Sequence, residues 1–111
     1  MPVSNLLTTL VERLLLLSTE GKIAWQETAD ANAFQASVSQ YVVTVSKSRD
    51  PEDDYSWAYE IRVADRRGRL VEEALSADLV PLFDAARRKA MNVDKHLTEL
   101  ISSLDSIGRS K

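Results

Sequence analysis

The side chains whose types could most readily bind a ligand or react lie in the stretch DAARRKAMNVDKHLTELISSL, residues 84–104. Arg87, Arg88 and Lys89 are consecutive, and three adjacent cations could hold a phosphate or a carboxylate. On a helix, however, three consecutive residues spread over about 200° of the surface, so they cannot form one anion pocket. Arg88 can instead pair with Asp84 one turn earlier, in the order that stabilises a helix. We therefore interpret this run as the solvated face of a helix, with Arg87 kept as a candidate anion contact.

His96 is the only histidine of the chain, and it lies at the edge of the apolar stripe of its predicted helix. A general base needs partners that orient it, and a lone histidine does not supply them. The chain has no cysteine and no His-rich motif, so the common zinc patterns are absent from the sequence. We predict no catalytic residue, no metal site and no cofactor, and a minimal enzyme with an unrecognised site ranks third among the functions considered.

A second basic cluster, Arg66, Arg67 and Arg69, falls in the segment DRRGR, residues 65–69. A hairpin tip cannot bury these side chains, so they could grip a phosphate or a carboxylate-rich partner. The alternative is a soluble turn whose charges discourage edge-to-edge pairing of sheets. The net charge of −3 disfavours a dedicated nucleic-acid binder, because such binding depends on neutralising phosphates with Lys and Arg. Anion or nucleic-acid binding at this tip is therefore the second function considered.

The aromatic residues Tyr55, Trp57 and Tyr59 alternate along one predicted strand. Such a row could stack bases of a single-stranded nucleic acid, as sheet platforms do. Interleaved cations on the same face would strengthen that interpretation, and none is predicted there. The aromatics continue into Ile61 and Val63 at the same spacing, which favours a face covered by helices.

The elements that position these residues follow from the periodicity of apolar side chains. A helix is predicted from a cap at Ser4 to a stop at Gly21, followed by alternating segments with a turn or bulge near Ser39 and Gln40. Residues 48–54, with Pro51, read as a loop, and 65–69 as a hairpin turn. The predicted strands contain the segments 23–25, 34–38, 41–45, 55–63 and 70–76.

The C-terminal third is predicted to be helical, as two helices or as one kinked helix. Ser76 or Asp78 can cap the first of them, since Pro81 is tolerated only in a first turn, and Asn92 is a plausible break. Gly108 should end the last helix. Together these elements predict an α+β fold with an N-terminal helix, a five-stranded antiparallel meander and C-terminal helices packed on one sheet face. Residues 1–111 then form a single domain, with a frayed tail at 108–111.

The first helix carries more apolar surface than one contact requires. Its predicted core stripe leaves three further apolar residues, Val11, Leu15 and Leu16, as a surplus surface. Contiguous exposed apolar side chains invite association, and a two-fold dimer is the commonest outcome. These three residues are thus the predicted homodimer interface. The stripe contains Val3, Leu6, Leu7, Leu10, Leu14 and Leu17, and the predicted core includes Trp25, Tyr59, Ile61, Phe83, Leu97 and Ile101.

The composition limits the class of protein and its location. The 111 residues include 44% hydrophobic and 28% charged residues, as in an ordinary globular domain. Glu12 and Arg13 interrupt the Leu-rich start, which excludes a signal peptide, and no apolar run is long enough to cross a bilayer. The absence of cysteine favours the cytoplasm. No membrane partner is therefore expected.

The order of a helix, a five-stranded meander and two helices resembles the layout of small bacterial partner-binding proteins, including class I secretion chaperones. Those proteins are likewise small, mildly acidic and dimeric, and the resemblance, which lies in layout, transfers no residue. It implies a non-catalytic protein-binding module of chaperone-, antitoxin- or immunity-like character. The expected partners are a second copy of the chain and another protein, with no nucleic acid and no membrane.

Overall fold

The computed structural model describes residues 5–50 and 52–109. The predicted helix cap and several other predicted positions lie outside these residues, as does the side chain of Tyr55. The positions concerned are Val3, Ser4, Pro51, Ser110 and Lys111.

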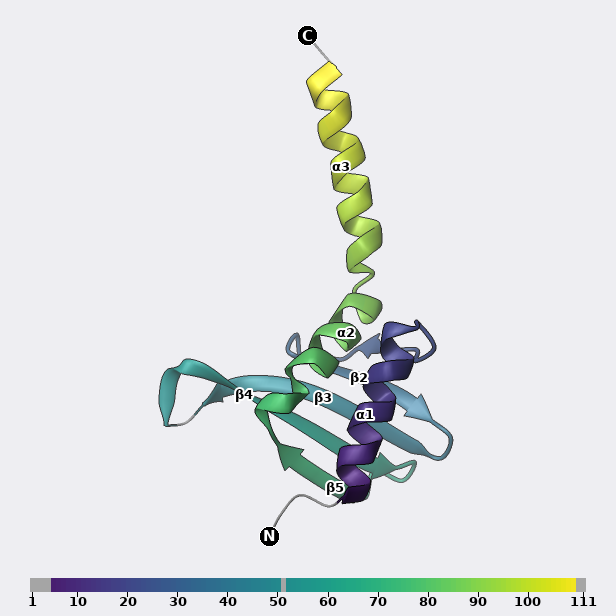
Figure 1. Ribbon diagram of the computed structural model, residues 1–111, viewed down its shortest axis with the longest axis vertical. Helices are drawn as coiled ribbons and strands as arrows, with labels where there is room; N and C mark the ends of the chain where they lie inside the picture. Colours follow the sequence, from purple (N-terminus) through teal and green to yellow (C-terminus); the bar gives the residue numbers. More distant parts are fainter. Residues whose placement is uncertain (1–4, 51, 110–111) are drawn as a thin grey trace.

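The chain folds as an N-terminal helix, five antiparallel strands in one open sheet, and two C-terminal helices, which confirms the predicted α+β class (Figure 1). The strands follow one another in chain order across the sheet, as a meander requires. Two helices lie over one face of the sheet, and the third projects away from it (Figure 1). The elements are α1 (Asn5–Thr19), β1 (Gln26–Glu27), β2 (Ala33–Val38), β3 (Tyr41–Asp50), β4 (Asp53–Asp65), β5 (Leu70–Leu75), the short 3-10 helix η1 (Ala77–Leu79), α2 (Val80–Ala90) and α3 (Val93–Arg109).

Two turns lie where the sequence predicts them, near Ser39 and at Gly68. Val38 pairs with Tyr41, so a two-residue turn joins β2 to β3, and Ser39 takes a positive φ of 57° there. Gly68 has a φ of 84° in the β4–β5 hairpin, a conformation that glycine adopts without steric cost. Ser76 caps η1 by accepting a hydrogen bond from the backbone N–H of Asp78. Local turn chemistry therefore fixes the register of the meander.

The predicted loop 48–54 was wrong at both ends, because the pairing of β3 with β4 continues to Asp50 and Asp53. The predicted strand at 23–25 was also wrong, since β1 is Gln26–Glu27 and Trp25 packs into the core before it.

The core lies between the sheet and the pair α1 and α2. Phe83 of α2 anchors this layer, because its ring centre lies 5.5 Å from those of Phe34 and Tyr59. At the end of α1, the indole N–H of Trp25 donates a buried 2.9 Å hydrogen bond to the hydroxyl of Ser18. The buried apolar residues are Leu7, Leu14, Trp25, Phe34, Ala36, Val43, Val45, Ile61, Val63, Leu79, Leu82, Phe83 and Ala86.

The buried face of α1 is rotated from the predicted stripe. Leu7 and Leu14 are buried, but Leu6 is 82% exposed, while Val11 and Leu15 pack against the core. The predicted surplus was therefore wrong for Val11 and Leu15, because the face that meets α2 and the sheet is centred nearer Ser18 than the wheel suggested. Among the described residues, none of the helices has both the length and the apolar character that crossing a bilayer requires.

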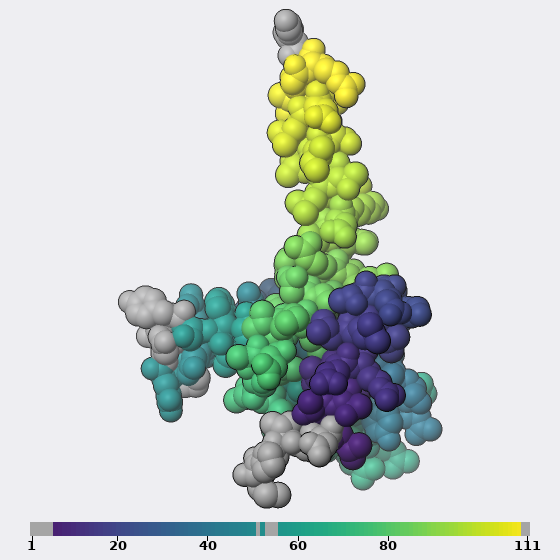
Figure 2. Space-filling view, in the orientation of Figure 1, coloured from purple at the N-terminus to yellow at the C-terminus, as the bar shows by residue number. Residues whose placement is uncertain are grey.

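The last helix departs furthest from expectation. Asn92, with a φ of 52°, separates α2 from α3, so the predicted break gives two distinct helices. No residue of α3 within the described part of the chain is buried, and Leu97 and Ile101, predicted for the core, are wrong. The space-filling view shows α3 as a column that stands clear of the body formed by the other elements (Figure 2). The helix also continues through Gly108 to Arg109.

Candidate functional site

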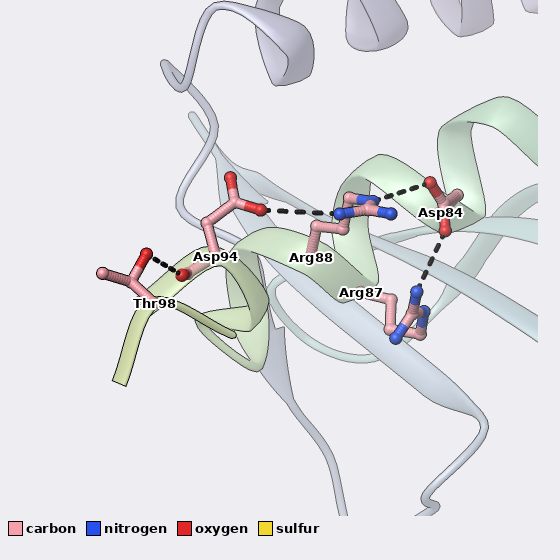
Figure 3. A network of polar contacts seen from close by, with 5 residues as sticks. All are labelled: Asp84, Arg87, Arg88, Asp94 and Thr98. Carbon is pink, nitrogen blue, oxygen red and sulfur yellow. Dashed lines mark hydrogen bonds and ion pairs between the residues drawn. The ribbon is translucent and has the colours of Figure 1, made fainter. Parts of the chain in front are cut away.

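The basic run of α2 forms ion pairs within its own helix and across the joint to α3 (Figure 3). Asp84 accepts hydrogen bonds from Arg87 at 3.2 Å and from Arg88 at 3.1 Å. Arg88 also approaches Asp94 at 3.5 Å, which links the two helices. Partial burial raises the pKa of Asp84, but the hydrogen bonds and charges of the two arginines outweigh it and hold the pKa below its ordinary value. These arginines act as structural partners of a carboxylate, as the solvated-face interpretation predicts.

The hairpin tip shows a similar engagement of its cations. Arg69 forms an ion pair with Asp65 at 3.0 Å, and Arg66 donates to the backbone carbonyl of Ser39 at 3.1 Å. The backbone N–H of Arg69 is the main cause that lowers the pKa of Asp65. Arg67 is exposed. Arg66 and Arg69, two of the three candidate anion-binding side chains, are thus engaged in contacts within the chain.

The two basic clusters do not converge. Arg87 lines a shallow hollow with Lys47 and Tyr59, which are register partners on β3 and β4. The hairpin tip follows the pair Tyr41 and Asp65, six register positions along the same two strands. At about 3.3 Å per residue this separation is about 20 Å. A single anion site built from Arg66, Arg67, Arg69 and Arg87 is therefore not formed within this chain.

Sequence reasoning missed a cluster of cations beside the aromatic strand. Lys47 and Arg49 of β3 each lie 4.6 Å from the ring centre of Trp57 on β4, measured from the Lys Nζ and the guanidinium carbon. The expectation that this face carries no cation was wrong, because the cations come from the neighbouring strand. The signal was present in the sequence, since Lys47 and Arg49 continue the same alternation as Val43 and Val45.

The remaining hollows show no catalytic or metal-binding arrangement. One of them, of about 660 Å³, lies between α2 and α3 and is lined by acidic and basic side chains, including Arg88, Lys95, Asp84 and Asp94. Among the residues that the structure describes, no cluster of His, Cys, Asp or Glu could hold a metal ion. Across the same residues, no buried side-chain nitrogen or oxygen lacks a hydrogen-bond partner.

His96 lies on the exposed surface of α3, with its Nδ1 4.0 Å from a carboxylate oxygen of Glu99. Both side chains are largely exposed, so this contact is a surface pair between adjacent turns. The surrounding residues form no enclosed site. The geometry gives His96 no catalytic partner among the described residues.

The most prominent candidate surface is the apolar row along α3. Its members repeat at alternating steps of four and three residues, which is the spacing of a helix that pairs with another helix. Their exposed fractions run from 48% for Leu97 to 68% for Ile107, apart from Val93, which is half-buried at the joint. We call this row the α3 seam: Val93, Leu97, Leu100, Leu104 and Ile107. Ile101, 59% exposed, flanks it.

An amphipathic helix of this kind is not stabilised by its own sequence alone. α3 has 17 residues, close to the length at which isolated helices become marginal in water. It also contains residues of low helix propensity, among them Thr98, Ser102, Ser106 and Gly108. Helices in proteins draw most of their stability from packing of an apolar face, and no α3 residue is buried by the described part of the chain. From Leu97 to Ile107 the seam is therefore an apolar surface that the described part of the chain leaves largely exposed.

The dimer surface predicted on α1 is reduced by the fold. Leu15 and Val11 are partly buried against the core, and Leu16 remains 59% exposed. A contact through Leu16 stays a prediction.

No protein-family model matches this sequence, and no curated protein and no solved structure matches it either.

Proposed function

We propose that this chain is a non-catalytic protein-binding module and that α3 is the element with which it holds its partner. The observation that supports this proposal is the α3 seam, an unbroken apolar row that is at least about half exposed from Leu97 to Ile107. Fully burying an aliphatic side chain contributes about 1.5–3 kcal/mol, so covering each half-exposed residue of the seam contributes about 1 kcal/mol. Several such residues acting together can hold a protein partner.

A chaperone-, antitoxin- or immunity-like role fits this proposal. Proteins of these classes work by covering a surface of another protein, and they need no reactive group. The body would then serve as a rigid base from which α3 projects. A cytoplasmic location is part of the same proposal, since the chain has no cysteine that an oxidising compartment could use.

Comparative capture tests the proposal. The immobilised chain is exposed to an extract of the cells that produce it, beside a variant with Leu100→Glu and Leu104→Glu. The matched control, Ser102→Glu with Ser106→Glu, adds the same charge at the same spacing on the opposite face of α3. We expect the wild type and the control to retain the same proteins and the Leu variant to lose them. Equal capture by all three forms would show that the seam is not the binding surface.

Anion binding remains a second candidate, now centred on Lys47. Lys47 and Arg87 line one hollow of about 430 Å³ together with Tyr59, and Trp57 lies beside Lys47. Cations beside aromatic rings are typical of surfaces that hold phosphates and stacked bases. Binding of a labelled single-stranded oligonucleotide should weaken with added salt and with Lys47→Ala, and should be less sensitive to Arg67→Ala. Absence of salt-sensitive binding would exclude this candidate.

A further inference from the structure

The α3 seam has the period of a two-stranded coiled coil. Steps of four and three residues average 3.5 per turn, so the row stays on one side of a helix that coils gently around a neighbour. Within the body, α1 and α2 already cover one face of the sheet, and α3 points away from it (Figure 1). The molecule is 63 Å long, of which α3 contributes about 25 Å. A helix from another chain can therefore lie along the whole seam.

We propose that the partner of α3 is the α3 of a second copy, paired antiparallel about a two-fold axis near Ser102. This inference rests on the proposed function, because it names the occupant of the same surface. In this register Leu97 meets Ile107 of the partner, and Leu100 meets Leu104 of the partner. The two-fold axis repeats both contacts, so one row of apolar residues supplies both sides of the interface.

The residues that flank the seam favour the antiparallel orientation. In an antiparallel pair each flank meets the same flank of the partner, which places Ile101 opposite its own copy and Ser103 opposite its own copy. A parallel pair would instead place Ile101 beside His96, leaving an apolar side chain against a polar one. Ile101 is 59% exposed in the single chain, and the antiparallel arrangement covers it.

The helix dipoles and the shape of the molecule favour the same orientation. In an antiparallel pair the positive end of each helix dipole lies beside the negative end of the other, which is favourable. Packed helices lie 8–10 Å apart, and the antiparallel arrangement places the two bodies at opposite ends, where they do not compete for space.

The first experiment measures molar mass in solution by light scattering over a hundredfold dilution. We expect twice the chain mass of 12.4 kDa at high concentration and a fall toward one chain on dilution. Leu100→Glu with Leu104→Glu should raise the dissociation constant by more than about a hundredfold, and Ser102→Glu with Ser106→Glu should leave it near the wild-type value. A wild type of single-chain mass throughout would overturn the inference.

The second experiment tests orientation and uses the absence of native cysteine. Leu100→Cys and Leu104→Cys are made as separate chains, one carrying a tag that changes its mass. A disulfide needs Cα atoms within about 7 Å, so under mild oxidation we expect linked dimers chiefly when the two chains are mixed. Equal linking of either variant alone would overturn the antiparallel pair, because identical positions meet in a parallel one. No linking in any sample would overturn the pairing itself.

Failure of this inference can be separated from failure of the proposed function. A wild type that remains a single chain, while the seam still governs capture of another protein, removes the second copy as the occupant and leaves the protein-binding function in place. Loss of both self-association and capture removes the function as well.

Discussion

The two C-terminal helices follow one another in the chain and are both amphipathic, yet they meet opposite environments. α2 buries Leu82, Phe83 and Ala86 against the sheet, whereas α3 buries no residue of its described length. Asn92 redirects the chain between them. An amphipathic pattern predicts that a face will be covered, but it does not tell whether the cover comes from the same chain or from another. The contrast between these helices is therefore the observation on which the proposed function rests.

The largest expected difference comes from the same substitution in each helix. Leu82→Ala should lower the free energy of unfolding by about 2–5 kcal/mol, because Leu82 is fully buried and leaves a cavity. Leu97→Ala should change it by less than about 1 kcal/mol in dilute solution, where the residue has no cover to lose. Chemical denaturation, followed by tryptophan fluorescence, measures both. Similar losses would mean that α3 packs on the body.

The buried polar contact of the body offers the next test. Ser18→Ala removes the acceptor of the Trp25 indole N–H in a buried position, which should cost about 1–3 kcal/mol. Thr19→Ala is the control, since its hydroxyl bonds the carbonyl of Leu16 at the exposed end of the same helix. Thermal unfolding of both variants checks the expectation. A neutral Ser18→Ala would show that this hydrogen bond does not fasten α1 to the sheet.

The joint between the two helices should be sensitive to backbone conformation. Asn92 has a φ of 52°, a conformation that costs a β-branched residue about 1–2 kcal/mol. Asn92→Val should lower the helical circular dichroism signal through loss of the first turn of α3, with little change in the unfolding of the body. Asn92→Gly should preserve both signals. A loss of body stability in Asn92→Val would show that the joint is part of the core.

The smallest expected effect concerns pH at the same joint. The pKa of Asp84 is lowered in the folded state, so its ion pairs with Arg87 and Arg88 stabilise the fold above the ordinary pKa of an aspartate, near 3.8. This contribution is lost as the pH falls below that value, because the folded carboxyl then takes up a proton. Asp84→Asn should flatten part of the acid limb of a stability curve. If the wild type and Asp84→Asn lose stability in the same way as the pH falls, the ion pairs of Asp84 do not contribute to stability.

Much of the fold could be predicted because its signals are local. The alternation in β4, the turn at Gly68 and the proline in the first turn of α2 each act over a few residues. The position of α3 could not be predicted, since its stripe suits a body and a partner equally well. The rotation of α1, which places Val11 and Leu15 against the core, depends on contacts with α2 and the sheet that lie far away in the sequence.

The candidate surfaces were predictable to different degrees. The pairing of Arg88 with Asp84 followed from helical spacing, and it is present at 3.1 Å. Predicting that Lys47 and Arg49 lie beside Trp57 requires the register between β3 and β4. The alternation of side chains along β3 already indicated that the two cations share a face. The spacing of the α3 seam is visible in the sequence, but its meaning depends on the helix standing clear of the body.

Hydrogen–deuterium exchange of the two helices, at two protein concentrations, tests the central claim most directly. Peptides from α2, residues 80–90, should be protected to the same extent at both concentrations, because the body of the same chain covers them. Peptides from α3, residues 93–109, should exchange quickly in dilute protein and more slowly in concentrated protein, because a second chain then covers the seam. Strong protection of α3 that does not change with concentration would contradict the account, since its cover would then come from its own chain.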